Sequence, residues 1–288
     1  MSLFTAIFQA IVQGLTEFLP VSSSGHLSLI QHFTGNSGDG ALFFSAILHL
    51  GTLVAVFVAF RKTIVGMIKE FFLLIRDLFT KKFSYKNMNA DRRMVIMIII
   101  STACLIPFYF FKDWFEGISE DSSIFAEGLC FLYTSAILYM SDRCTKGKKT
   151  PDNITGKDAL TVGLFQGVAL LPGVSRSGST ISAGLFTGFS RSTAVKYSFI
   201  LGIPAILGGC LLELKDAVTT HADIQVGNCI VGFIVAAIVG LCAIKLVDWL
   251  VKSDKFKIFA YYTLVLGIVV LIIAFIEMCM GHPISFAK

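Results

Sequence analysis

The sequence has few charged residues for its length, and this scarcity excludes an ordinary soluble domain. Of the 288 residues, 15% are charged and 55% are hydrophobic, and the mean hydropathy is +0.77. Soluble domains contain about 25% charged residues. We therefore predict an all-α polytopic membrane protein, because helices satisfy their own backbone hydrogen bonds in lipid. The length leaves no room for a large additional soluble domain.

Paired cysteines and a basic leader are also missing. The seven cysteines form no CxxC pair and no metal-ligand spacing, so they give no indication of catalysis. Residues 1–13 lack the basic region that opens a secretory signal peptide, and we expect the N-terminus to belong to the mature fold. The net charge of +5 follows from membrane topology and predicts no nucleic-acid partner.

Six apolar segments are long enough to cross a bilayer, which takes about 20 residues. They span 41–60, 94–111, 124–140, 197–214, 226–244 and 258–276. Eighteen of the 24 Lys and Arg residues lie in three of the connecting segments, 61–93, 141–157 and 245–257. Segments 112–127 and 213–223 together hold eight acidic residues, and each holds one basic residue. The positive-inside rule therefore places the three basic segments in the cytoplasm.

One motif occurs twice, 153 positions apart. Residues 13–26 read QGLTEFLPVSSSGH and residues 166–179 read QGVALLPGVSRSGS, with six identical positions. The same offset pairs FSAILHLG, residues 44–51, with YSFILGIP, residues 197–204. We predict a single integral membrane domain with two repeat halves and a cytoplasmic linker. Their proposed boundaries are 1–140, 154–288 and, for the linker, 141–153.

Both copies of the motif lie in apolar stretches, 1–40 and 158–190, that we predict to be re-entrant. Basic residues flank the second stretch at both ends, so its two ends belong on one side of the membrane. Each stretch would consist of two helices separated by a break. The break lies at Pro20 in the first stretch and at Pro172 and Gly173 in the second. Such breaks must line a protein cavity, because lipid cannot satisfy free backbone groups. Counting the spans places the two hairpins on opposite sides, which predicts an inverted-topology repeat.

Arg176 is the only charged residue between Ala159 and Ser190 in the second apolar stretch. An intramembrane Arg costs about 2.5 to 3.5 kcal/mol, so it indicates function. Its planar guanidinium suits phosphate oxygens, and a structural ion pair with Glu17 is the alternative. Turns rich in Ser and Gly that open a helix form anion-binding cradles. The residues predicted to bind substrate in these turns are Ser22, Ser24, Gly25, Ser175, Ser177, Gly178 and Thr180.

Glu17 and His26 lie on opposite sides of Pro20 and are expected to converge on one cavity. Glu17 suits a hard cation such as Mg²⁺ or Ca²⁺, or a proton, and His26 can act as acid, base or nucleophile. Gln13 lies one helical turn before Glu17 and shares its face. For His49, packing and site-lining are equally good interpretations.

These paired motifs resemble the bacterial undecaprenyl-diphosphate phosphatase family, which is linked to bacitracin resistance, and the resemblance extends over essentially the whole chain. It implies removal of the terminal phosphate of undecaprenyl diphosphate, which recycles the lipid carrier for peptidoglycan and other cell-wall glycans. It also implies a divalent cation, Mg²⁺ or Ca²⁺, and a bacterial plasma membrane with the site open to the outer face. Bacitracin would compete with the protein by binding the lipid substrate. The resemblance is also compatible with a homo-oligomer.

The resemblance carries over residue by residue. The acidic motif falls on Gln13 and Glu17, its Ser and His on Ser23 and His26, and PGxSRSxxT on residues 172–180 around Arg176. This implies that Glu17, Ser23, His26 and Arg176 are catalytic and that Glu17 holds the cation. Many members have Glu where this chain has Gln13, which weakens any mechanism that requires two carboxylates on the first helix.

Three routes of attack on the terminal phosphorus remain open at this point. The nucleophile is Ser23 with a neighbouring base, His26 itself, or water activated by Glu17 or His26. A second class of function is a flippase for phosphorylated polyprenyl carriers, because broken helices in inverted repeats are common in transporters. The reactive side chains favour the enzyme, since anion binding alone does not need them.

Overall fold

The fold is helical, as the composition predicts. The computed structural model describes residues 2–34, 39–82, 84, 88–111, 123–144, 146–171, 173–219, 225–282 and 284. These residues form helices and, apart from one isolated bridge between Lys149 and Phe189, no β-structure. The prediction of an all-α polytopic membrane protein is confirmed.

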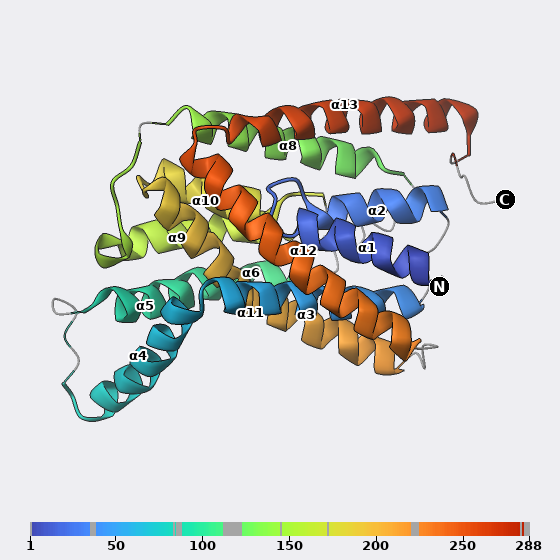
Figure 1. The fold of residues 1–288 in the computed structure, drawn as a ribbon. Helices are drawn as coiled ribbons and strands as arrows, with labels where there is room; N and C mark the ends of the chain where they lie inside the picture. The colour runs from blue at the N-terminus through green and yellow to red at the C-terminus, as the bar shows by residue number, and fades with distance from the viewer. Residues whose placement is uncertain are drawn as a thin grey trace.

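The first copy of the motif forms a helical hairpin. Helices α1 (Leu3–Thr16) and α2 (Ser23–Thr34) lie side by side (Figure 1). The turn between them contains Pro20 and ends at Ser22, whose φ of 71° lies in the left-handed region. Because few residues other than Gly adopt that region, Ser22 marks a tightly determined break in the helix.

The second copy repeats this arrangement. Helix α9 (Gly156–Val168) begins with a capping box made by Thr155 and Asp158, and α10 (Arg176–Phe186) begins after the N-cap Ser175. Gly173 in the intervening break has a φ of +89°, which favours glycine. Pro172, predicted at the same break, lies outside the described residues.

The tips of the two hairpins meet in the middle of the molecule. In Figure 1, α1 and α9 start at opposite ends of the protein and run toward each other. The Ser177 hydroxyl donates to the Leu19 carbonyl at 3.2 Å, and the Gly173 N–H donates to Ser24 Oγ at 3.4 Å. A Cβ on Gly25 would lie 3.1 Å from Gly173 Cα, so close approach of the two backbones requires glycine there. The boundaries of the two repeat halves stay a prediction.

Long helices surround the hairpins at the positions of the six predicted spans. They are α3 (Asp39–Ala59), α5 (Ala90–Ala103) with α6 (Leu105–Tyr109), α8 (Phe125–Asp142), α11 (Arg191–Thr219), α12 (Val226–Lys252) and α13 (Lys257–Met280). Of the described helices, α12, α13 and α11 over Arg191–Leu212 are long and apolar enough to cross a membrane on their own. The predicted span 94–111 is interrupted at Cys104, because Pro107 cannot donate a hydrogen bond to the carbonyl of Ala103.

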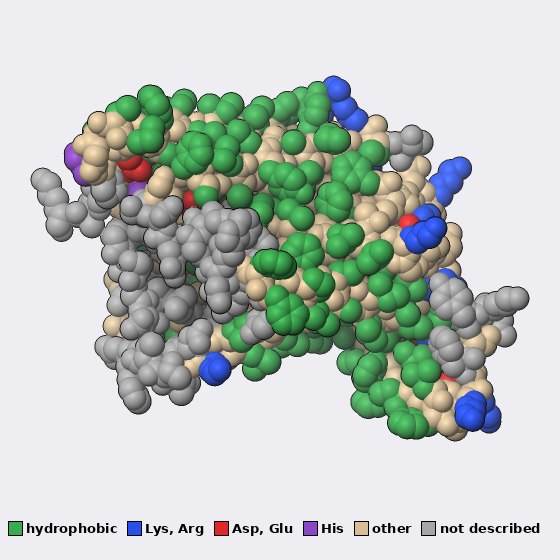
Figure 2. Space-filling model, turned by 180° about the vertical axis from the view of Figure 1, so that it is seen from behind, with side chains coloured by type: hydrophobic (Ala, Val, Ile, Leu, Met, Phe, Trp, Pro, Cys, Tyr) green, Lys and Arg blue, Asp and Glu red, His purple; other side chains and the backbone are tan. Residues whose placement is uncertain are grey.

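Helix α4 (Arg61–Phe79) leaves α3 at an angle of 89° and projects from the body of the molecule (Figure 1). Large apolar side chains such as Phe72 and Phe79 are exposed on it. Arg92 at the start of α5 ties it down through ion pairs of 2.8 Å to Glu70 and Asp77. Most of the Lys and Arg side chains visible in Figure 2 lie at this end of the molecule. An amphipathic helix at the basic end fits the membrane interface.

The segment predicted as a linker, 141–153, is attached to the second hairpin. The Lys149 N–H donates to the Gly188 carbonyl at 3.0 Å, and the Ser190 N–H donates to the Lys149 carbonyl at 2.9 Å. The ammonium of Lys149 also pairs with Asp158 at the start of α9, at 2.8 Å. These bonds fix the position of the N-terminal end of α9 relative to the C-terminal end of α10.

The loop before α13 is held by charges from two other segments. Arg191 pairs with Asp142 at 3.1 Å and with Asp254 at 3.0 Å. The ammonium of Lys146 donates to Asp254, and this hydrogen bond is the main reason that the pKa of Asp254 lies below its ordinary value. These ion pairs join two of the basic connections, 141–157 and 245–257, to the start of α11.

Candidate active site

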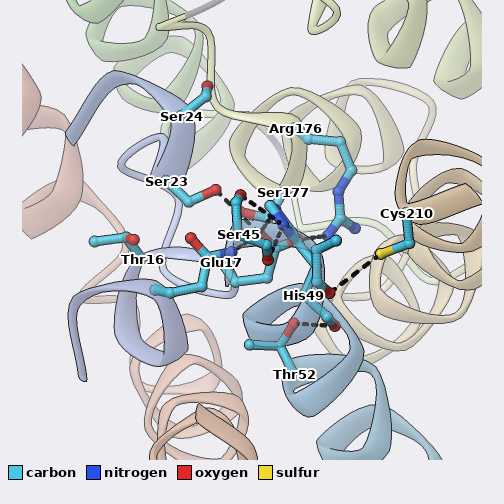
Figure 3. Close-up of polar contacts among 12 residues, drawn as sticks. Thr16, Glu17, Ser23, Ser24, Ser45, His49, Thr52, Arg176, Ser177 and Cys210 are labelled. Carbon is cyan, nitrogen blue, oxygen red and sulfur yellow. Dashed lines mark hydrogen bonds and ion pairs between the residues drawn. The ribbon is translucent and has the colours of Figure 1, made fainter. Parts of the chain in front are cut away.

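Glu17 lies at the tip of the first hairpin, where it is buried and contacts both repeats (Figure 3). Its Oε1 accepts a hydrogen bond from Nη2 of Arg176 at 2.5 Å. Its Oε2 accepts from Gln13 Nε2 and from the Ser23 hydroxyl, each at 3.0 Å. The carboxylate therefore connects a guanidinium to a hydroxyl that can act as a nucleophile. Gln13 and Glu17 share a helix face as predicted, and Arg176 forms with Glu17 the ion pair that was the alternative interpretation of its role.

An open cavity of about 180 Å³ lies beside this cluster. Its lining includes Glu17, Ser23, His49, Arg176, Ala205, Ile206, Gly209 and Cys210. Ser23 is the first residue of α2, and Arg176 is the first residue of α10. Two helix N-termini thus begin at the cavity wall, where their partial positive charges favour an anion. Together with Arg176, they make the cavity suitable for a phosphate group.

The guanidinium of Arg176 rests against α11. Its Nη1 donates to the Ser198 carbonyl at 3.4 Å. A Cβ built on Gly202, one turn further along α11, would overlap the guanidinium itself. A glycine at position 202 is therefore required for Arg176 to reach Glu17 in this conformation.

His49 of α3 belongs to the site. Its Nε2 lies 3.6 Å from Glu17 Oε2, and its Nδ1 lies 3.0 Å from the Ser45 carbonyl. Because a carbonyl only accepts, Nδ1 carries a proton and Nε2 faces the carboxylate. Site-lining is thus the correct interpretation of the two that the sequence left open. The sequence does contain one indication that His49 lines the site. The repeat offset of 153 positions pairs His49 with Gly202, and both residues adjoin the ion pair between Glu17 and Arg176.

His26 is directed elsewhere. Its Nδ1 donates to the Ser22 carbonyl at 2.7 Å, and its Nε2 lies 2.6 Å from the hydroxyl of Tyr262 on α13. The imidazole also stacks on the Tyr262 ring and meets Phe131 of α8 edge-on. The structure therefore does not place His26 with Glu17 in the cavity described above. The left-handed turn at Ser22 orients α2 so that this side chain faces α8 and α13, and nothing in the sequence indicated Tyr262.

The other residues predicted to bind substrate hold the hairpin tips in shape. Ser22 Oγ accepts from the Gly25 N–H at 3.2 Å, and Ser175 Oγ accepts from the Gly178 N–H at 3.1 Å. The hydroxyl of Thr180 contacts Ser198 Oγ at 2.6 Å. These side chains, with Ser24 and Ser177, support the cavity from outside its lining.

A divalent cation finds no complete site among these residues. Glu17 is the one carboxylate in the cavity lining, and both of its oxygens already accept hydrogen bonds. Within the described part of the chain, no group of three or more His, Cys, Asp and Glu side chains is arranged to hold a metal. The predicted metal-binding role of Glu17 therefore finds no second carboxylate among the described residues that line the cavity.

The comparisons with known proteins agree on one family. The family model described as "Bacitracin resistance protein BacA" matches residues 6–269. The chain is 41% identical over 274 residues to a protein of Alkaliphilus metalliredigens named undecaprenyl-diphosphatase, covering 94% of this chain and 98% of the relative. It is 40% identical over 278 residues to a protein of the same name from Methanosphaera stadtmanae, covering 95% and 99%. The chain therefore belongs to the BacA family of bacitracin resistance proteins.

Proposed function

We propose that this chain hydrolyses undecaprenyl diphosphate to undecaprenyl phosphate and inorganic phosphate. The observation that carries the proposal is the placement of Arg176 and two helix N-termini next to the hydrogen-bonded pair Ser23 and Glu17. The names of the relatives support the same substrate and the same reaction. The product is the carrier lipid in the form that cell-wall glycan assembly uses, and bacitracin would oppose the reaction by binding the diphosphate.

Substrate binding would exchange one anion for another at Arg176. In the free protein the guanidinium is paired with Glu17. The terminal phosphate offers several oxygens in a geometry that matches the guanidinium fork, so it replaces the carboxylate there. This exchange leaves Glu17 with the Gln13 amide and the Ser23 hydroxyl as its hydrogen-bond partners.

The geometry favours Ser23 as the nucleophile. Its hydroxyl already donates to Glu17 Oε2 at 3.0 Å, which is the arrangement of a nucleophile and a general base. Ser23 Oγ would form a bond to the terminal phosphorus as the bond from that phosphorus to the bridging oxygen breaks. Glu17 takes the hydroxyl proton, and undecaprenyl phosphate leaves. Water then hydrolyses the phosphoserine. Both nitrogens of His26 are engaged by Ser22 and Tyr262, which disfavours direct attack by the imidazole.

We place the protein in the plasma membrane with the cavity open to the outer face. The N-terminal end of α11 adjoins the basic connections that the positive-inside rule assigns to the cytoplasm. The cavity-lining residues of this helix lie further along it, at Ala205, Ile206, Gly209 and Cys210. The flippase alternative is less well supported, because transport would not require a serine paired with a carboxylate.

Phosphate release by purified protein in detergent tests the proposed function directly. Detergent micelles have no two sides, so transport produces no signal in this assay. We expect the wild-type protein to release inorganic phosphate from undecaprenyl diphosphate in the presence of Mg²⁺ or Ca²⁺. Thermal unfolding checks that the purified protein is folded. If folded protein releases no phosphate with either cation, the proposal is contradicted.

Rapid quench with substrate labelled on the terminal phosphate should trap the label on Ser23. Phosphoserine survives acid, whereas phosphohistidine does not, so the two are distinguished by the quench conditions. The Ser23→Ala variant should lose the label and at least about 10³-fold of the rate. His26→Gln should still form the adduct. An acid-labile adduct that depends on His26 would overturn the assignment of Ser23.

We also propose that the reaction requires a divalent cation that arrives with the substrate, since Mg²⁺ in phosphate-transfer sites commonly uses substrate oxygens as ligands. Chelation by EDTA should lower phosphate release by about 10²-fold, and added Mg²⁺ or Ca²⁺ should restore it. Thermal unfolding of the protein without substrate should be unchanged by EDTA, because the described residues form no complete metal site. A large loss of stability on chelation would indicate a resident structural metal instead.

A further inference from the structure

The cavity has two ends of different chemistry. One end carries Glu17, Ser23, His49 and Arg176. The other is formed by α11 alone, through Ala205, Ile206, Gly209 and Cys210, which are apolar or small. A lipid diphosphate has the same division, with a charged head group and a long hydrocarbon chain. The polar end accounts for the head group and leaves the apolar end without an assigned role.

Gly209 is both part of the cavity lining and exposed at the protein surface. A Cβ on Gly209 would meet no atom within 4 Å, so open space adjoins this position. The neighbouring Leu207 and Leu211 are 40% and 69% exposed. Exposed leucines on a membrane helix face lipid, so the cavity reaches the lipid-facing surface of α11 at Gly209.

The side of α11 toward α3 is closed. Cys210 is buried and its thiol lies 3.6 Å from the Ala46 carbonyl of α3. Leu53 of α3 packs in the same apolar cluster with Ile206 and Cys210. A hydrocarbon chain that starts at Arg176 therefore meets packed side chains on one side of the helix and open space at Gly209.

We propose that the prenyl chain of the lipid diphosphate leaves the phosphate site past Gly209 and enters the bilayer there. This rests on the proposed function for the identity of the head group. The opening is continuous with the cavity that holds the phosphate-binding residues. It would therefore be occupied by the prenyl chain of the same lipid molecule whose head group is bound there. Glycine at 209 keeps the opening wide, because any larger side chain would stand in the path of the hydrocarbon.

The test compares tryptophan at two adjacent positions of α11. Gly209→Trp places an indole in the opening. Gly208→Trp is the matched control, because Gly208 is equally exposed, has no neighbour within 4 Å of a built Cβ and does not line the cavity. A Cβ at either position meets no atom within 4 Å, and both substitutions replace glycine in a helix, so both variants should fold.

Binding of labelled undecaprenyl diphosphate to the purified variants is the primary measurement, and inorganic diphosphate is the probe of the head-group site alone. We expect Gly209→Trp to weaken binding of the lipid by at least about tenfold, and Gly208→Trp by less than about twofold. Inorganic diphosphate should bind all three proteins within about twofold. The KM for undecaprenyl diphosphate should rise in Gly209→Trp and stay close to the wild-type value in Gly208→Trp.

Unchanged lipid binding in Gly209→Trp would overturn the proposal, as would equal weakening in both variants. An equal loss of inorganic diphosphate binding in Gly209→Trp would also overturn it, because position 209 would then belong to the head-group site. Binding does not depend on turnover. Selective weakening in Gly209→Trp without any phosphate release by wild type would therefore contradict the proposed hydrolysis and leave the chain exit in place.

Discussion

Replacing Arg176 by alanine is expected to lower phosphate release by at least about 10³-fold, the scale on which a guanidinium stabilises phosphoryl transfer. Arg176 is the only Lys or Arg among the described residues that line the cavity, and it starts a helix whose N-terminus faces the same space. Its loss removes charge neutralisation at the terminal phosphate when negative charge develops on the leaving group. Initial rates of phosphate release at saturating substrate measure the effect.

The alanine variant also leaves Glu17 buried without its counter-ion, which costs about 3 to 5 kcal/mol of stability. Two further variants separate this effect from catalysis. Arg176→Ala combined with Glu17→Gln removes the unpaired charge and should recover thermal stability without recovering activity. Arg176→Lys keeps the charge and loses the planar fork, so it should retain only a small part of the rate. A folded Arg176→Ala protein with more than about a tenth of wild-type activity would refute the phosphate-binding role.

Gly202→Ala should lower kcat/KM by about 10²-fold. The added methyl would occupy the position of the Arg176 guanidinium and force it away from Glu17. The displaced group is the flexible end of a side chain, so the backbone need not move and the protein should remain folded. Phosphate release and thermal unfolding, measured on the same preparation, test both statements.

Gly208→Ala is the matched control for this change. It lies on the same helix and introduces the same methyl group, and a Cβ there meets nothing within 4 Å. We expect its activity to stay within about twofold of wild type, because exposed substitutions of this kind have small effects. Equal activity of Gly202→Ala and Gly208→Ala would mean that Arg176 works from another conformation.

The sequence was most informative where physical chemistry penalises a residue type. Polar residues and helix breaks inside apolar stretches indicated the two hairpins, and the structure places both breaks at the predicted turns. An isolated Arg and an isolated Glu at comparable depth indicated a meeting point, and they form an ion pair. Both inferences depend on the cost of polarity in lipid, which acts regardless of tertiary detail.

The side of a helix from which a given side chain projects was harder to predict. Ser23 and His26 are three residues apart near the start of α2, and the sequence placed both in one cavity. Ser23 contacts Glu17, whereas His26 contacts Tyr262, 236 positions away. The left-handed conformation of Ser22 sets this orientation, and no pattern in the sequence specifies it. Contacts between residues so far apart depend on the packing of α2 against α13.

Small residues were also underestimated. Glycines in membrane spans commonly allow close helix packing, and Gly232 does lie against Phe44 and Leu48 of α3. Gly202 instead provides space for a functional side chain, and Gly209 borders open space. What an absent side chain makes room for becomes evident only when the neighbouring atoms are in place.

The ion pair between Glu17 and Arg176 has a consequence for repeated turnover. In the proposed mechanism, each released phosphate ion must displace the Glu17 carboxylate before it can bind Arg176 again. The carboxylate is tethered on the opposing hairpin and is always present, so it competes with the free ion at a high effective concentration. The lipid substrate, which is concentrated in the membrane plane and gains additional binding from its hydrocarbon chain, is favoured in this competition. The enzyme thus carries its own protection against product inhibition, in the form of a built-in competitor that the correct substrate displaces more readily than the product does.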